Sequence, residues 1–186
     1  MRILTLVFSL LFFNTSAYAN DILVIEIDGQ VSGLVEVELF SEVAPKHVER
    51  VKALANIGAY NDVVFHRVID GFMAQTGDIQ FGKKGSSDIG KAGRGGSELP
   101  DLSEEFSNLK YSKGVVGMAR SAHPDSANSQ FFIMFDDAPF LNGKYTIFGK
   151  VISGQNIVDK IKRGEGSNGA VNDPDFMSKV YIKDDD

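Results

Sequence analysis

Short apolar segments bounded by turn residues are the feature of this chain that most constrains its fold. Residues 22–27 and 34–39 favour two strands, and the second alternates apolar and acidic side chains as a half-buried strand does. Asp28-Gly29 begins the turn between them, which indicates a hairpin. Further strands are predicted over residues 63–68, 72–76, 115–120, 130–135, 145–151 and 176–182.

Two segments have helical rather than strand spacing. A helix is predicted from about Val43, with Ser41 as its N-terminal cap and Pro45 in its first turn. A second helix is predicted over residues 155–163. Seven or eight short strands with two isolated helices predict a mainly β protein whose antiparallel sheet closes on itself, with the helices over its open ends. The pattern alone supports a barrel and a sandwich equally.

The N-terminal residues match the pattern of a signal peptide. Arg2 precedes an apolar run over residues 3–13, and Ala17-Tyr18-Ala19 supplies the small residues of a cleavage site. An uncleaved membrane anchor is the alternative, but the run is too short to span a bilayer. We therefore expect a signal peptide at 1–19 and one domain at 20–186. The expected location is the periplasm, with secretion as the alternative.

Composition excludes several kinds of function. The chain has no cysteine, which excludes thiol catalysis, and its net charge of −6 argues against nucleic-acid and anionic-membrane partners. Three scattered histidines give no metal-ligand spacing, so no metal site is expected. His123, Asp125 and Ser126 crowd one turn and are interpreted as loop residues rather than a triad. Glu104 and Glu105 are expected in a solvated turn.

Residues 65–78 place Arg67 and Gln75 beside Phe72 and Met73 on a predicted strand–turn–strand. A fixed cation above an apolar pocket, with no nucleophile, suits a reaction that breaks no covalent bond. Rotation about an X–Pro bond is such a reaction, with a barrier of about 18–20 kcal/mol from the loss of amide resonance. A guanidinium that donates to the nitrogen of the twisted amide binds that form better than either planar isomer. Read alone, Arg67 is more often a solvated strand residue.

Three further motifs change this balance. Together with residues 65–78, the segments 117–120 (GMAR), 129–133 (SQFFI) and 140–151 (FLNGKYTIFGKV) resemble the cyclophilin family of peptidyl-prolyl isomerases, most of all its exported bacterial branch. The resemblance covers nearly all of 21–182. It implies a closed eight-stranded antiparallel β-barrel capped by two α-helices, with the active groove on its outer face. It also implies a cofactor-free monomer that acts on unfolded or extended proline-containing polypeptides.

The resemblance also assigns roles to individual positions. Arg67 matches the family's catalytic arginine, and Gln75 matches its partner that hydrogen-bonds the peptide backbone. His66 is given a structural hydrogen-bonding role, because the reaction needs no proton transfer. The proline pocket matches Phe72, Met73, Phe132 and Leu141. The stretch that pairs with the extended peptide matches Ala119 and the backbone of Arg120, with Gln130 beside it. The pocket edge matches Phe140 and Tyr145.

Some positions depart from the family pattern. Phe140 stands where tryptophan is usual, which implies weak binding of cyclosporin-type ligands, and Tyr145 stands where histidine is common. Residues 93–96 resemble the glycine-rich pocket rim, but Arg94 replaces a small residue. A cation there is expected to favour an acidic residue upstream of the target proline. The loop 79–92 looks longer than in compact members.

The predicted function is acceleration of X–Pro isomerisation during the folding of exported proteins. The alternative is a non-catalytic chaperone that binds proline peptides in the same groove. The retained arginine argues against that alternative, because a pure binder has no need of it.

Overall fold

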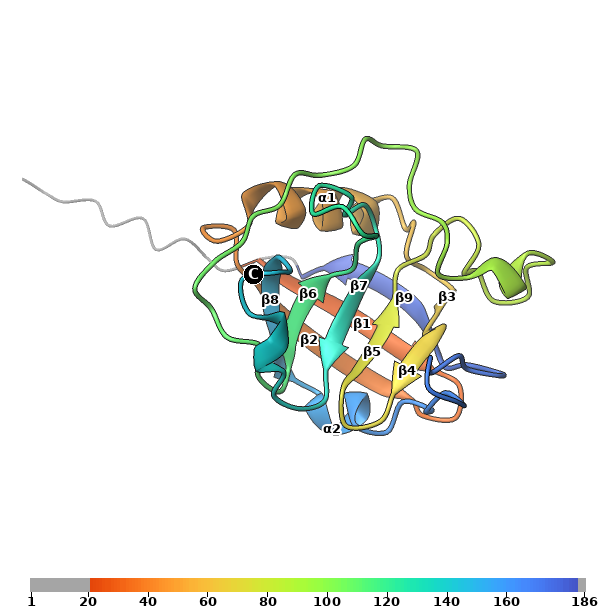
Figure 1. Ribbon diagram of the computed structural model, residues 1–186. Coiled ribbons are helices and arrows are strands. Elements are labelled where there is room, and N and C mark those ends of the chain that lie inside the picture. The colour runs from red at the N-terminus through yellow and green to blue at the C-terminus, as the bar shows by residue number, and fades with distance from the viewer. Residues whose placement is uncertain (1–20, 184–186) are drawn as a thin grey trace, which may run out of the picture.

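The computed structural model describes residues 21–183, so the predicted signal peptide at 1–19 lies outside the described residues. Its centre is one sheet of nine strands in which every neighbouring pair is antiparallel (Figure 1). In sheet order the strands are β3 (Val63–Val64), β9 (Phe176–Ile182), β1 (Ile22–Asp28), β2 (Gly33–Leu39), β8 (Ile147–Ser153), β6 (Val115–Met118), β7 (Phe131–Met134), β5 (Met73–Thr76) and β4 (Arg67–Ile69).

The sheet curls round until its two outermost strands are neighbours in the chain. β3 and β4 end the strand order, yet only Phe65 and His66 separate them. The backbone N–H of Phe65 donates to the Asp175 carbonyl, and that of Val68 donates to the Gly169 carbonyl. These bonds to a distant segment break the strand expected over 63–68 into two. The mainly β fold is confirmed, with nine strands in place of eight and a curled sheet that only approximates a closed barrel.

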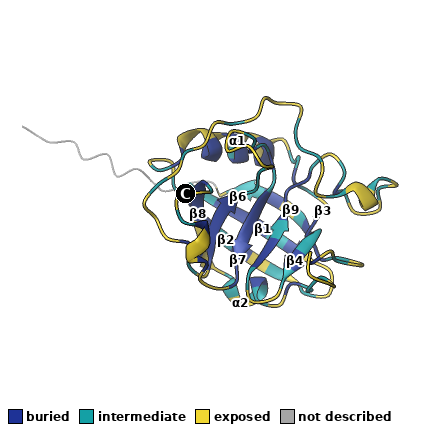
Figure 2. Cartoon of the chain, viewed as in Figure 1, coloured by how far each residue is buried: buried dark blue, intermediate teal, exposed yellow. Residues whose placement is uncertain are grey.

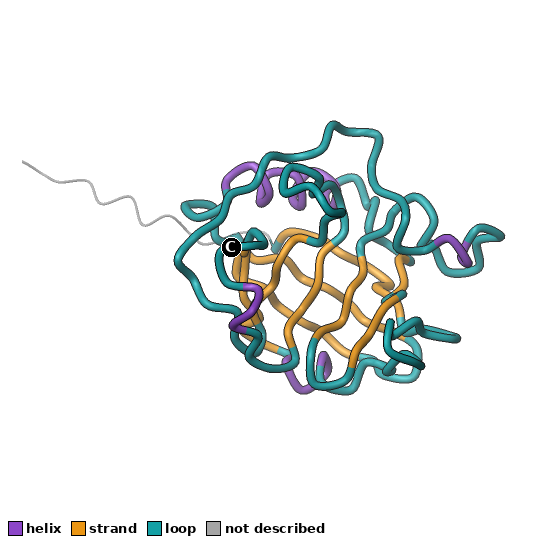
Figure 3. The backbone as a smooth tube through the Cα atoms, viewed as in Figure 1, coloured by secondary structure: helices purple, strands orange, loops and turns teal. Residues whose placement is uncertain are grey.

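Two helices lie at opposite ends of this curled sheet (Figures 1 and 3). α1 (Pro45–Asn56) begins at its proline, and Ala44 occupies the N-cap position without a side-chain bond, so the predicted cap at Ser41 is wrong. α2 (Gln155–Val158) is a single turn instead of the helix expected over 155–163, because the N–H groups of Lys160 and Ile161 bond carbonyls three residues back rather than four. The N–H of Lys162 then donates to the carboxylate of Asp175. Between residues 21 and 183, no helix has the length and apolar character needed to cross a membrane.

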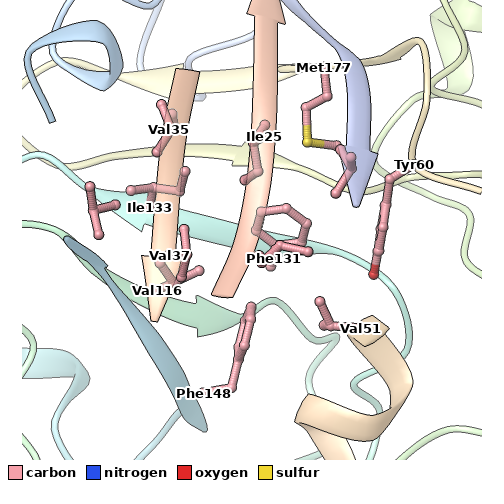
Figure 4. Packing of buried hydrophobic residues seen from close by; sticks show 14 of the residues in the cluster. Ile25, Val35, Val37, Val51, Tyr60, Val116, Phe131, Ile133, Phe148 and Met177 are labelled. Carbon is pink, nitrogen blue, oxygen red and sulfur yellow. The ribbon is translucent and has the colours of Figure 1, made fainter. Parts of the chain in front are cut away.

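The core fills the inner face of the sheet and the space under α1 (Figure 2). The side chain of Phe131 lies between Tyr60 and Phe148, with ring centroids 5.6 and 6.0 Å away (Figure 4). Because side chains alternate along a strand, Phe132 and Met134 of β7 point the other way, into a second apolar cluster. One strand therefore supports the core with one face and the outer groove with the other.

A long connection leads from β5 to β6 and passes over α1 (Figure 1). It contains one short 3-10 turn, η1 (Ile89–Lys91), in the segment predicted as a surface loop. Glu105 anchors the connection: its Oε2 lies 2.7 Å from Nδ1 of His47, and its carboxylate also accepts the N–H groups of Lys46 and His47 at the start of α1. The expectation that Glu105 lies in a solvated turn is therefore wrong, because α1 supplies its partners.

Candidate active site

Arg67 is fixed at two points of its guanidinium. It stands on β4 directly opposite Gln75 on β5. Its Nε donates to the carbonyl of Asn168 at 3.0 Å, and its Nη1 donates to Oε1 of Gln75 at 3.1 Å. Nη2 has no partner among residues 21–183. Partial burial lowers the pKa of this guanidinium from its ordinary value, but an arginine side chain stays charged in proteins.

Two glutamines continue this network across the sheet. Nε2 of Gln75 donates to Oε1 of Gln130 at 2.9 Å, and Nε2 of Gln130 donates to the carbonyl of Gly95 at 2.8 Å. Each amide uses its oxygen toward the arginine side and its nitrogen toward the glycine-rich segment. The orientation of Arg67 is therefore coupled to the position of the segment at 93–96.

Beside Arg67 lies a pocket of about 460 Å³ with both apolar rings and cationic side chains in its lining; we call it the apolar pocket after the rings that form its wall. Phe132 forms part of its wall, with the ring of Tyr145 nearly perpendicular at a centroid distance of 6.0 Å. At the edge, Phe72 and Phe140 lie 5.4 Å apart, and Phe140 is 60% exposed. The sequence-predicted residues that line this pocket are Arg67, Phe72, Met73, Gln75, Ala119, Arg120, Phe132, Phe140, Leu141 and Tyr145. Lys144 lines it too and was missed, because a lone lysine in a polar turn carries no sequence signal.

A second pocket of about 400 Å³ adjoins the first. Gln75, Ala119 and Arg120 line both, so the two form one groove with these residues at its middle. Gln130 lies in this second part rather than in the apolar pocket. The remaining lining residues are Gln80, Gly93, Arg94, Gly95, Gly96, Ser97, Asp101, Ser121, Ser126 and Asn128.

Asp78 holds the rim of the second pocket in place, a role that the sequence analysis missed. Its fully buried carboxylate accepts backbone N–H groups from Gln80, Phe81, Gly93 and Gly95 at 2.7–3.1 Å. A Cβ atom at position 95 would lie 2.6 Å from Oδ1 of Asp78, so a side chain there would push the rim away. The one available signal was a lone acidic residue ahead of a glycine-rich segment.

His66 lies under the rim, with Val64 and Gln130 close enough to its ring to raise its pKa slightly against the larger effect of burial. Both ring nitrogens are buried, and neither has a partner at full hydrogen-bond geometry among the described residues, so the structural hydrogen-bonding role of His66 stays a prediction. The ring lies against Gly93, where a Cβ atom would come within 3.0 Å of Cδ2. Burial lowers the pKa of His66 to about 4, with Arg67 acting in the same direction and Asp78 opposing it. The imidazole is therefore neutral at pH 7.

Arg120 lines both pockets, and hydrogen bonds hold its side chain in place. The guanidinium lies 4.4 Å from the centroid of the Tyr145 ring and donates to the carbonyls of Lys144 and Ser121, each at 2.9 Å. The N–H of Ala119 is already bonded to the carbonyl of Gln130, whereas the N–H of Arg120 has no partner in the described part of the chain. An extended peptide has a backbone donor available there.

Two other kinds of site considered from the sequence are not formed among the described residues. No group of three or more acidic or histidine side chains between residues 21 and 183 could hold a metal ion. The hydroxyl of Ser126 donates to the carbonyl of His123 rather than to its imidazole, so these two residues form no nucleophile–base pair. The arrangement can grip a small apolar group, hold an extended backbone beside it and direct a guanidinium N–H at the junction.

Comparison with known proteins gives one consistent result. Residues 22–184 match the family described as cyclophilin type peptidyl-prolyl cis-trans isomerase/CLD. A probable peptidyl-prolyl cis-trans isomerase of Brucella suis is 58% identical over 155 residues, which cover 82% of this chain and 79% of that protein. The peptidyl-prolyl cis-trans isomerase-like 3 of Gallus gallus is 42% identical over 157 residues, with 82% and 88% covered.

Solved structures agree with the sequence matches. A cyclophilin-type peptidyl-prolyl cis-trans isomerase of Cryptosporidium parvum, crystallised in the presence of the dipeptide Ala-Pro, has a TM-score of 0.73 at 29% identity, with 88% of this chain and 99% of that chain covered. A cyclophilin of Hirschia baltica has a TM-score of 0.70 at 25% identity, with 87% and 73% covered.

Proposed function

The chain belongs to the cyclophilin-type family of peptidyl-prolyl cis-trans isomerases, and we propose that it accelerates X–Pro isomerisation in extended segments of exported proteins. One observation carries the proposal for the site. Arg67 is held by Asn168 and Gln75 beside an apolar pocket, with its Nη2 left available. The Ala-Pro dipeptide of the Cryptosporidium parvum structure is the kind of ligand that this groove would take.

In the proposed mechanism, the groove binds the twisted amide more tightly than either planar isomer. Phe132 and Met73 would hold the pyrrolidine ring while the carbonyl before it rotates. The nitrogen then loses its resonance and becomes an acceptor for Nη2–H of Arg67. One preorganised donor of this kind supplies about 10²–10³ in rate. Because Gln75 and Asn168 already orient the guanidinium, little reorganisation is needed at the moment of rotation.

We place the mature enzyme in the periplasm, after cleavage between Ala19 and Asn20. The support is the N-terminal pattern of a basic start, an apolar run and an Ala-x-Ala ending. Uncatalysed X–Pro isomerisation takes tens of seconds or more, slow enough to limit the folding of an exported protein. Mass spectrometry of the N-terminus of protein recovered from the periplasm checks this: a first residue other than Asn20 would contradict the cleavage site.

A non-catalytic chaperone that uses the same groove is the alternative, and stoichiometry separates the two. We further propose that the enzyme acts as a monomer. We also propose that it binds cyclosporin-type ligands weakly, because Phe140 presents no hydrogen-bond donor at the pocket edge. The support for a catalyst over a binder is the fixed guanidinium, which adds nothing to gripping an apolar ring.

The decisive experiment is refolding of a protein whose slow phase is limited by proline isomerisation, with the mature chain at one part in a hundred. A catalyst shortens the slow phase at this ratio, because each molecule turns over many times. A holdase at this ratio leaves the rate unchanged, and at equimolar ratio it slows refolding. An unchanged slow phase at every ratio would remove the catalytic proposal.

A further inference from the structure

The groove has the opposite charge to the protein as a whole. The chain has a net charge of −6, yet the two pockets are lined by Arg67, Arg94, Arg120 and Lys144. Among the lining residues, Asp101 is the one carboxylate. A cationic groove on an acidic protein attracts ligands of the opposite sign more than the overall charge suggests.

The cations of the groove also lack the partners that several cations elsewhere have. Lys52, Lys113 and Arg163 each lie 2.5–2.8 Å from an aspartate. Within residues 21–183, no carboxylate lies within 4 Å of the charged nitrogens of Arg94 or Lys144. The charge at the groove is therefore left for a ligand.

Asp101 offsets only part of this charge. Its Oδ1 accepts a hydrogen bond from Nδ2 of Asn128 at 2.9 Å, and no ion pair of the described residues joins it to Arg94. Arg120 faces both pockets with its guanidinium held over Tyr145, so its charge is fixed in place. The second pocket alone thus contains two cations and one carboxylate.

The backbone at Arg94 is positioned although its side chain is exposed. The carboxylate of Asp78 holds the N–H groups of Gly93 and Gly95, on either side of it, at 2.7 and 2.9 Å. The carbonyl of Gly95 is held in turn by Gln130. These hydrogen bonds fix the position of the Arg94 backbone on the rim, so the charged end of its side chain reaches a limited region of the second pocket.

We propose that Arg94, supported by Arg120, makes the groove select substrates with an acidic side chain two residues upstream of the proline. This rests on the proposed isomerase function. An extended chain advances about 3.3–3.6 Å per residue, so with the proline in the apolar pocket a residue two positions away lies about 7 Å along the groove. That distance brings its side chain from the junction at Gln75 and Arg120 into the second pocket.

The experiment measures kcat/KM by NMR exchange for peptides Ala-Xaa-Ala-Pro-Ala in which Xaa is Glu, Gln or Lys. An exposed ion pair changes affinity by about two- to fivefold. Because Glu is attracted and Lys is repelled by the same cations, wild-type protein is expected to prefer Glu over Lys by about tenfold at low salt. Arg94→Gln should lower the Glu-to-Lys ratio by about two- to fivefold, and Arg94→Lys should keep most of it. Lys160→Gln makes the same charge change outside the groove and should leave the ratio unchanged. Salt at 0.5 M should reduce the wild-type ratio.

Three results would overturn the inference: an Arg94→Gln ratio equal to that of wild type, a wild-type ratio that ignores salt, or an equal Arg94 effect when Glu follows the proline. If wild-type protein still accelerates isomerisation of the Gln peptide, these results refute the charge selection and leave the proposed isomerase function standing. If no peptide of the series isomerises faster, the isomerase function itself fails, and the inference falls with it.

Discussion

Gln75 accepts a 3.1 Å hydrogen bond from Nη1 of Arg67 across the β4–β5 ladder. The two residues are register partners, so the sheet itself sets their separation. Gln130 accepts a hydrogen bond from Nε2 of Gln75 and donates one to the carbonyl of Gly95. Orientation of the arginine is thus a property of the fold rather than of a bound substrate.

Replacing Gln75 is expected to slow isomerisation without unfolding the protein. Gln75→Ala removes the acceptor that fixes Nη1 of Arg67, and we expect kcat/KM to fall about tenfold because orientation is lost while the charge stays. Gln130→Ala acts one bond further away and should cost less. Because the residues share one network, the double variant should lose less than the product of the two single effects. Strictly multiplicative losses in NMR exchange rates would contradict this coupling.

His66 predicts a pH dependence of stability. Its pKa falls from 6.5 to about 4 in the folded protein, so the unfolded chain binds an additional proton between these values. The free energy of unfolding is therefore highest above pH 6.5 and decreases as the pH falls toward 4. This group contributes a slope of at most about 1.4 kcal/mol per pH unit. Urea unfolding at several pH values measures the slope.

Burial also lowers the pKa of His47, so the comparison must isolate His66. In His66→Gln the free energy of unfolding is expected to vary less steeply between pH 4.5 and 6.5, whatever its absolute value. A variant with the wild-type slope would show that His66 does not contribute.

Glu105 is expected to stabilise the start of α1. Glu105→Ala removes the acceptor for the N–H groups of Lys46 and His47 and leaves the buried Nδ1 of His47 unpartnered. We expect a loss of about 1–3 kcal/mol in the free energy of unfolding. Glu104→Ala, at the exposed neighbouring position, is the matched control and should cost less than about 0.5 kcal/mol. Equal losses for the two variants would refute the anchoring role.

Phe140 is expected to limit cyclosporin affinity. Phe140→Trp adds an N–H donor and a larger ring at the pocket edge, which should tighten binding about tenfold in calorimetry. Phe106→Trp adds the same side chain at an exposed site that lines neither pocket, and its affinity should match wild type. Tightening by both variants would mean that the effect does not arise at the pocket.

The strands with clear alternation were predictable from the sequence, and the corners between them were not. Residues 34–39 alternate apolar and acidic side chains, and β2 extends them by only Gly33. The break between β3 and β4 depends on hydrogen bonds from Phe65 and Val68 to a segment about a hundred residues away. Local periodicity contains no record of such partners.

The same limit applies to the site. Long motifs identified the residues of the apolar pocket, and the structure brings those residues together. Asp78 and Glu105 were missed or misjudged because their importance lies in backbone amides that they accept from other segments. The sequence did not show that burial would dominate the environment of the His66 ring and lower its pKa. Side-chain identity suggests chemistry, but burial and backbone partners decide it.

The central claim is that Nη2 of Arg67 stabilises the twisted X–Pro bond, and NMR exchange of a neutral proline peptide tests it most directly. Arg67→Ala and Arg67→Lys should each lower kcat/KM by about 10²–10³, with unchanged circular dichroism and with peptide binding retained. Lys160→Ala, which removes a cation outside the groove, should behave as wild type. Exchange at the wild-type rate in folded Arg67→Ala would contradict the account.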